Sequence, residues 1–106
     1  MTDSRREKIE AMLADLPGDV FLRYSLAMEW DKEDRHDVSL QLLGELSREE
    51  PPYVPAFFMA GQQLVRLDRI DEARTFLRDG IETARAQNDS HAAGEMSELL
   101  ASLGPM

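Results

Sequence analysis

Two histidines, His36 and His91, carry the only imidazole groups in the sequence, so metal or acid–base chemistry would have to start from them. His91 and Glu95 form a single i, i+4 pair, and the sequence places no further ligand close to His36. Protein zinc sites need three or four ligands. We therefore expect neither a metal nor a catalytic role at these positions. His36 stands 34 positions before Ile70, and we interpret it as a half-buried structural residue.

Other patterns that carry catalysis are missing from the sequence. It has no cysteine, which excludes thiolate nucleophiles, disulfides and cysteine-ligated metals. There is no glycine-rich loop that would cradle a phosphate and no Gly-x-Ser-x-Gly turn. The acidic residues around Asp31 and Asp34 lack the spacing and the central glycine of a calcium loop. We predict a protein that is not an enzyme and needs no cofactor.

Charge and hydropathy argue against two further classes. The 106 residues include 21 acidic and 12 basic ones, for a formal net charge of −9. This charge would repel a nucleic-acid backbone, because such partners are held by clustered Lys and Arg. Dispersed acid is typical of a solvated surface, with a preference for basic partners as the alternative. No segment approaches the ~20 apolar residues of a membrane span, so we expect a cytoplasmic protein.

Apolar residues recur at helical spacing in six stretches, and we predict an all-α domain without strands. The central unit, residues 52–84, holds two such stretches separated by a polar turn at 67–69. Gly61 lies on its apolar stripe, where we expect it to let a neighbouring helix approach closely. The first and last stretches are expected to form terminal helices, and their apolar stripes are Ile9, Met12, Leu13 and Leu16, and Met96, Leu99, Leu100 and Leu103.

The sequence matches itself when it is shifted by 34 residues. Small residues then fall on small ones and large apolar residues on large apolar ones. The aligned pairs are Pro17 with Pro51, Ala27 with Gly61, Trp30 with Leu64, Arg35 with Arg69, Ser39 with Ala73, and Leu43 with Leu77. A period of this length is typical of stacked helix pairs. An unrelated helical bundle whose two hairpins happen to match is the alternative.

This pattern resembles the tetratricopeptide repeat, which places aromatic, small and proline residues at fixed offsets. The matching residues of the second copy are Phe57, Ala60, Gly61, Leu64, Ala73 and Leu77. Those of the first copy are Leu26, Ala27, Trp30, Leu43 and Pro51. The departures are Arg23 in an aromatic slot, Ser39 in an alanine slot and Arg85 in place of proline. The resemblance implies a right-handed stack of antiparallel helix pairs with a concave groove, and it implies no chemistry.

The resemblance also divides the single domain, residues 1–106, into four parts. The first is a half-repeat helix over 1–17, followed by one repeat over 18–51 and another over 52–85. Residues 86–106 are expected to form a capping helix that covers the open end of the stack.

A second stripe on the two first helices is the candidate binding surface. It consists of Tyr24, Met28 and Lys32, which recur 34 positions later as Phe58, Gln62 and Arg66. The resemblance implies that the first helix of each pair lines the groove. Aromatic and Arg side chains carry much of the binding energy at interfaces. The alternative is that this stripe packs under the last helix. Lys32 and Arg66 would suit a partner's carboxylate, although the asparagines of the family's carboxylate-clamp members are absent.

Two functions follow from these observations. The first is a non-catalytic protein–protein interaction module that binds a peptide or helix of a partner in the groove. The alternative is a self-associating structural or scaffold unit, a homo-oligomer formed through the terminal helices.

Overall fold

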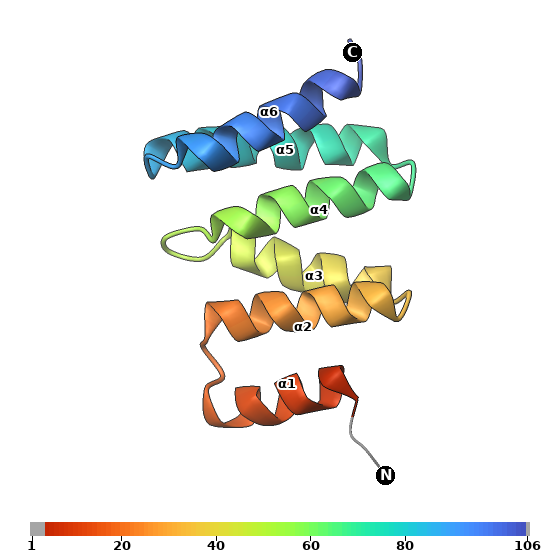
Figure 1. Ribbon diagram of the computed structural model, residues 1–106, viewed down its shortest axis with the longest axis vertical. Coiled ribbons are helices and arrows are strands. Elements are labelled where there is room, and N and C mark those ends of the chain that lie inside the picture. The colour runs from red at the N-terminus through yellow and green to blue at the C-terminus, as the bar shows by residue number, and fades with distance from the viewer. Residues whose placement is uncertain (1–3, 106) are drawn as a thin grey trace.

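The chain folds into an elongated stack of antiparallel helices (Figure 1). The computed structural model describes residues 4–105, and its extents are 49 × 29 × 19 Å. Each helix packs mainly on its neighbours in sequence, with a smaller contact between α4 and α6. The two termini therefore lie at opposite ends of the stack. The helices of the described residues are α1 (Arg5–Asp15), α2 (Val20–Lys32), α3 (His36–Ser47), α4 (Val54–Arg66), α5 (Ile70–Ala86) and α6 (Ser90–Ser102). The predicted all-α fold of six helices is confirmed.

The 34-residue period appears in the backbone as well as in the side chains. Helices α2 and α4 begin at Val20 and Val54, and helices α3 and α5 begin at His36 and Ile70. Asp34 and Asp68, in the turns that join these pairs, have φ angles of 61° and 59°. Asp is one of the few residue types besides Gly that adopts this left-handed conformation readily. The two helices of each pair are thus connected by the same type of turn.

Two apolar clusters form the core, one in each half of the stack. The first lies between α2, α3 and α4, and its buried members are Ala27, Leu43, Leu46, Ala56 and Ala60. The second lies between α4, α5 and α6, and its buried members are Val54, Phe57, Leu77, Ile81, Ala84, Ala93 and Met96. Because Ala93 and Met96 come from α6, this helix completes the second cluster.

Two glycines lie where a neighbouring helix leaves no room for a side chain. A Cβ atom added at Gly61 would lie 2.7 Å from Cδ2 of Leu77 on α5. One added at Gly80 would lie 2.5 Å from Sδ of Met96 and 2.6 Å from Cβ of Phe57. Carbon atoms do not approach non-bonded neighbours this closely. The expectation that Gly61 lies at a helix crossing is confirmed, and Gly80 lies at a second crossing.

Ser39 and Arg23, the two residues of the first repeat that depart from the tetratricopeptide pattern, both have polar partners. Ser39, in an alanine slot, is fully buried and donates a 2.7 Å hydrogen bond to the carbonyl oxygen of Ala27. Its Oγ also accepts a 2.9 Å hydrogen bond from Nε2 of Gln63, which is fully buried on α4. Arg23, in an aromatic slot, forms an ion pair with Glu49. The hydroxyl of Ser39 therefore joins α2, α3 and α4 where an alanine would make only apolar contacts.

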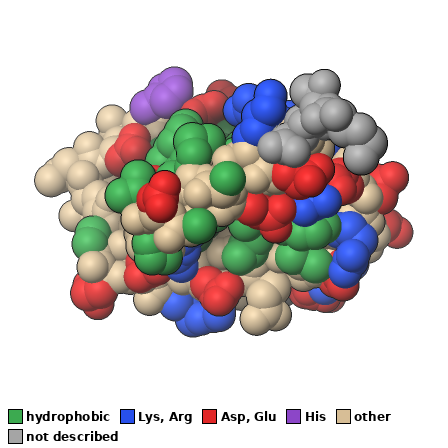
Figure 2. Space-filling view, turned by 90° about the horizontal axis from the view of Figure 1, so that it is seen from below, with side chains coloured by type: hydrophobic (Ala, Val, Ile, Leu, Met, Phe, Trp, Pro, Cys, Tyr) green, Lys and Arg blue, Asp and Glu red, His purple; other side chains and the backbone are tan. Residues whose placement is uncertain are grey.

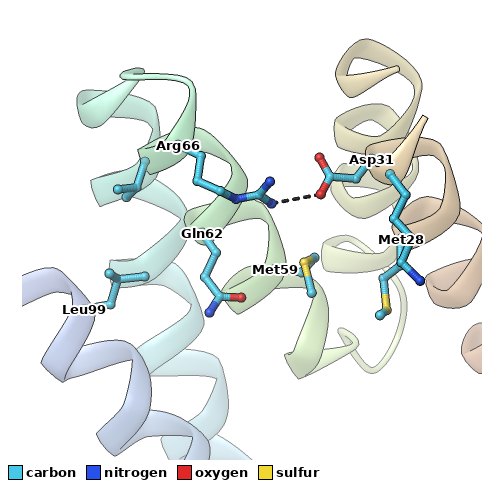
Figure 3. A pocket seen from close by; sticks show the side chains of 8 residues that line it. Met28, Asp31, Met59, Gln62, Arg66 and Leu99 are labelled. Carbon is cyan, nitrogen blue, oxygen red and sulfur yellow. Dashed lines mark hydrogen bonds and ion pairs between the residues drawn. The ribbon is translucent and has the colours of Figure 1, made fainter. Parts of the chain in front are cut away.

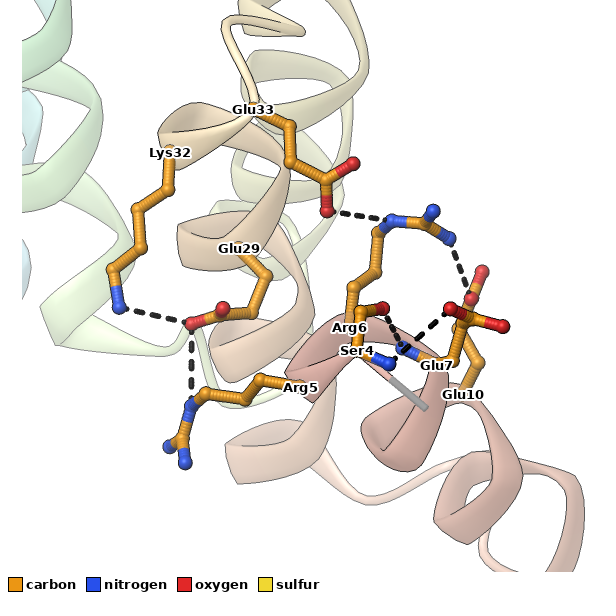
Figure 4. Close-up of polar contacts among 8 residues, drawn as sticks. All are labelled: Ser4, Arg5, Arg6, Glu7, Glu10, Glu29, Lys32 and Glu33. Carbon is orange, nitrogen blue, oxygen red and sulfur yellow. Dashed lines mark hydrogen bonds and ion pairs between the residues drawn. The ribbon is translucent and has the colours of Figure 1, made fainter. Parts of the chain in front are cut away.

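Ion pairs connect α1 to α2 and to Glu33, the residue that follows α2 (Figure 4). Arg6 pairs with Glu33 at 2.8 Å, and Arg5 pairs with Glu29 at 3.3 Å. The Arg6 guanidinium also lies 4.2 Å from the centre of the Trp30 ring, a favourable cation–π distance. Of the predicted apolar stripe of α1, only Ile9 is buried. The stripe is mostly uncovered because α1 has substantial contacts with α2 alone.

Candidate functional site

The first helices of the repeats and the capping helix surround a hollow of about 470 Å³ (Figure 3). Capping side chains set where two of these helices begin: Asp19 accepts a hydrogen bond from the Leu22 backbone N–H, and Asp89 accepts one from that of Ala92. The wall is formed by Met28, Asp31 and Lys32 of α2, Met59, Gln62, Val65 and Arg66 of α4, and Leu99 of α6. Helices α3 and α5 contribute nothing to this wall.

Asp31 is the electrostatic centre of the site. Its Oδ2 accepts a 2.9 Å hydrogen bond from Arg66, which links α2 to α4 across the hollow (Figure 3). Its Oδ1 lies 2.8 Å from Nδ1 of His36 at the start of α3. The Asp31 side chain is 12% exposed, whereas that of Arg66 is 57% exposed. The carboxylate is therefore shielded, and the guanidinium is the part of the pair that faces solvent.

Lys32, which also lines the hollow, has an acidic partner of its own. Its ammonium group lies 3.0 Å from Glu29, which is itself well covered and also pairs with Arg5 (Figure 4). Both cations predicted to receive a carboxylate thus have acidic partners within the protein. They remain largely exposed and keep free N–H donors, since an ammonium carries three and a guanidinium five.

The structure brings four of the six predicted site residues together. Met28, Lys32, Gln62 and Arg66 all line the hollow. Tyr24 instead packs edge-on against the ring of Tyr53, with ring centres 5.5 Å apart. Burial raises the pKa of the Tyr24 hydroxyl above its ordinary value.

Phe58, the sixth predicted residue, packs against the second core cluster. Tyr24 and Phe58 lie one turn before Met28 and Gln62, and each packs against one of the two core clusters. Helix α6 contributes Ala93 and Met96 to the second cluster.

Four lining residues were not among the predicted ones. Asp31 and Val65 occupy equivalent positions of the two repeats, one helical turn after Met28 and Gln62. Extending the stripe by three residues would have found them. Met59 follows Phe58 directly and lies outside the predicted stripe. Leu99 was assigned to the capping stripe, and it both packs on the core and reaches the hollow.

The histidines occupy unremarkable positions for chemistry. His36 is half-buried beside Asp31, in agreement with its interpretation as a structural residue. His91 is exposed and lies 3.1 Å from Glu95 one turn along α6. Across residues 4–105 no three His, Asp or Glu side chains are arranged to hold a metal ion. None of the helices formed by these residues has the length and apolar character needed to span a bilayer.

A stack of equivalent helix pairs, with a hollow lined by their first helices, defines a helical-repeat protein. Two solved structures of a tetratricopeptide repeat domain protein from Salinibacter ruber are similar to it. The solution structure is 34% identical, covers 83% of this chain and 89% of its own, and has a TM-score of 0.77. The crystal structure is 35% identical, covers 78% of this chain and 93% of its own, and has a TM-score of 0.70. The chain belongs to the tetratricopeptide repeat family.

A protein from Bordetella parapertussis shares the fold at lower sequence identity. It is 24% identical, the match covers 96% of this chain and 89% of that one, and the TM-score is 0.80. No protein-family model matches the sequence, and no curated protein matches it.

Proposed function

We propose that the chain is a non-catalytic protein–protein interaction module that receives a peptide or helix of a partner in the hollow between α2, α4 and α6. Stacked helical repeats generally present such concave surfaces to other proteins. The single observation that carries the proposal is the composition of the wall, which combines the apolar side chains of Met28, Met59, Val65 and Leu99 with two cations that are paired within the protein, Lys32 and Arg66. This arrangement suits one apolar anchor side chain of a polypeptide, flanked by polar groups.

The apolar part of the wall can adjust to side chains of different shape. Met28 and Met59 contribute flexible thioether side chains from two different helices, and Leu99 closes one side of the hollow (Figure 3). Methionine adjusts to different apolar shapes better than branched side chains do. The charged groups that line the hollow already have partners, so binding an apolar side chain leaves no buried charge unpaired.

The test begins with random peptides displayed on phage and selected on the immobilised chain. Synthetic versions of the selected peptides are then titrated by fluorescence anisotropy against the double variant Met28→Glu with Gln62→Glu. Both residues line the hollow, and the new carboxylates would have to be desolvated by an apolar anchor. We expect the variant to lose about 2 kcal/mol or more of binding free energy, a factor of about thirty in Kd.

A matched control carries the same change of charge elsewhere. Gln41→Glu with Thr75→Glu places two carboxylates on exposed positions of α3 and α5, which do not line the hollow. This control should bind the selected peptides like the unaltered chain. Peptides that bind both double variants equally well would show that the binding surface is elsewhere, and selection of no peptide at all would count against the proposal.

A further inference from the structure

The exposed large apolar side chains of the described part of the chain all lie at one end of the stack. Among residues 4–105 the exposed large hydrophobic residues are Met12, Leu16, Val20 and Phe21, all from the end of α1 and the start of α2. The exposed fractions of Met12, Leu16 and Phe21 are 47%, 56% and 64%. Figure 2 shows this end of the molecule, where hydrophobic side chains lie between acidic and basic ones. An apolar patch that is rimmed by charges marks an interaction surface.

The repeat explains what is missing there. Under the 34-residue period α1 corresponds to α3, and Met12 takes the place of Leu46. Leu46 is fully buried because α3 lies between α2 and α4, which supply Ala27 and Ala56 to its surroundings. Met12 has a helix on one side only. The uncovered apolar surface at Met12 is therefore the place where a further helix would pack if the stack continued.

The charges around Met12 indicate which helix would fit. Lys8 and Asp15 lie about one turn before and one turn after Met12 on the same face of α1, and both are exposed. Within residues 4–105 neither has an ion-pair partner. Two α1 helices that cross antiparallel about a two-fold axis at Met12 bring Lys8 of one copy beside Asp15 of the other, twice. The surface is thus complementary in charge to itself.

We propose that this α1 end surface, formed by Lys8, Met12, Asp15, Leu16 and Phe21, is a self-association site that takes the same surface of a second copy. The apolar residues of the two copies cover one another, and the two Lys8–Asp15 pairs fix the antiparallel direction. The site is separate from the hollow, so the dimer leaves both hollows open and presents two of them at once.

The first experiment measures the mass of the full chain by sedimentation velocity over the micromolar to millimolar range. The unaltered chain should shift from monomer to dimer as its concentration rises. Met12→Glu should remain monomeric, because its dimer would bury one new carboxylate from each copy near the two-fold axis. Gln41→Glu, an exposed change on α3 that adds the same charge, should dimerise like the unaltered chain. Circular dichroism checks that both variants keep their helices.

The second experiment tests the direction of the pairing. Lys8→Glu alone and Asp15→Lys alone place like charges opposite each other in their own homodimers, and each should dimerise about tenfold more weakly. Mixed in equal amounts, these two variants should form a heterodimer as stable as the unaltered homodimer, because both pairs are then opposite in sign.

Three results would overturn the proposal. The chain could stay monomeric at every concentration, which would leave a helix of another protein as the occupant of the surface. The dimer could form equally well with Met12→Glu, which would place the contact elsewhere. The two charge variants could fail to recover one another, which would exclude the antiparallel arrangement.

Discussion

At Gly80 a single added methyl group would crowd two neighbouring helices at once. Its α-carbon faces Met96 of α6 and Phe57 of α4, and a Cβ would lie within 2.6 Å of both side chains. We expect Gly80→Ala to lower the free energy of unfolding by about 1–3 kcal/mol, because overpacking pushes three helices apart. Thermal melting followed by circular dichroism measures this loss.

Gly94 supplies the matched control for that change. It lies inside helix α6, and a Cβ at this position would meet nothing within 4 Å. Gly94→Ala should therefore stabilise the protein by up to about 1 kcal/mol through helix propensity alone. If both substitutions shifted the melting temperature in the same direction, steric crowding at Gly80 would not be the explanation.

Ser39 and Gln63 form a buried polar pair that the apolar pattern of the family does not contain. Gln63 Nε2 donates to Ser39 Oγ, and Gln63 Oε1 has no hydrogen-bond partner among residues 4–105. Ser39→Ala would leave the whole amide unpaired, and we expect a cost of about 1–3 kcal/mol. In a Gln63→Met background the same substitution should cost much less, because no buried amide remains.

Urea unfolding of the two single variants and the double variant measures this coupling as a double-mutant cycle. An equal cost of Ser39→Ala in both backgrounds would mean that the two side chains act independently. The sequence marked Ser39 as a departure from the repeat pattern. Its partner could not be predicted, since Gln63 corresponds to the charged Glu29 in the first repeat and no periodic signal singles it out.

At the scale of the helix, α1 differs from the others in what holds it. Ile9 is its only buried side chain among residues 4–105, its other contacts with the end of α2 include the ion pairs of Arg5 and Arg6, and exposed ion pairs weaken as salt increases. We expect amide hydrogens of α1 to exchange several-fold faster at high salt, while those of α4 change little. Hydrogen exchange resolved by NMR measures both helices in one sample.

Two arginine substitutions distinguish the loss of the contact between α1 and α2 from the loss of a positive charge elsewhere in the protein. Arg6→Gln removes the pair with Glu33 and the contact with Trp30, so it should speed exchange in α1 even at low salt. Arg69→Gln removes the same charge from a pair with Glu72 in the first turn of α5, and should leave α1 unchanged. Similar exchange rates in the two variants would show that these charges do not hold α1.

The periodicity of the sequence was sufficient to predict the helices, because small and large residues recur at offsets that only stacked helix pairs require. It was less informative about the site. Met28 and Gln62 share a stripe with Tyr24 and Phe58, and spacing alone does not tell which end of a stripe stays open. That depends on the loop carrying Tyr53 and on α6, which lie outside the repeated helices.

For the whole molecule, the order of contacts along the chain has a consequence for its synthesis. The first cluster is complete only when Ala56 and Ala60 of α4 are present, and the second needs Ala93 and Met96 of α6. A chain emerging from the ribosome N-terminus first thus exposes α1, α2 and α3 before either cluster can close. We expect the first cluster to close once α4 has emerged and the second only after Met96, so a nascent chain released between these two points exposes apolar side chains of α4 and α5 to proteases.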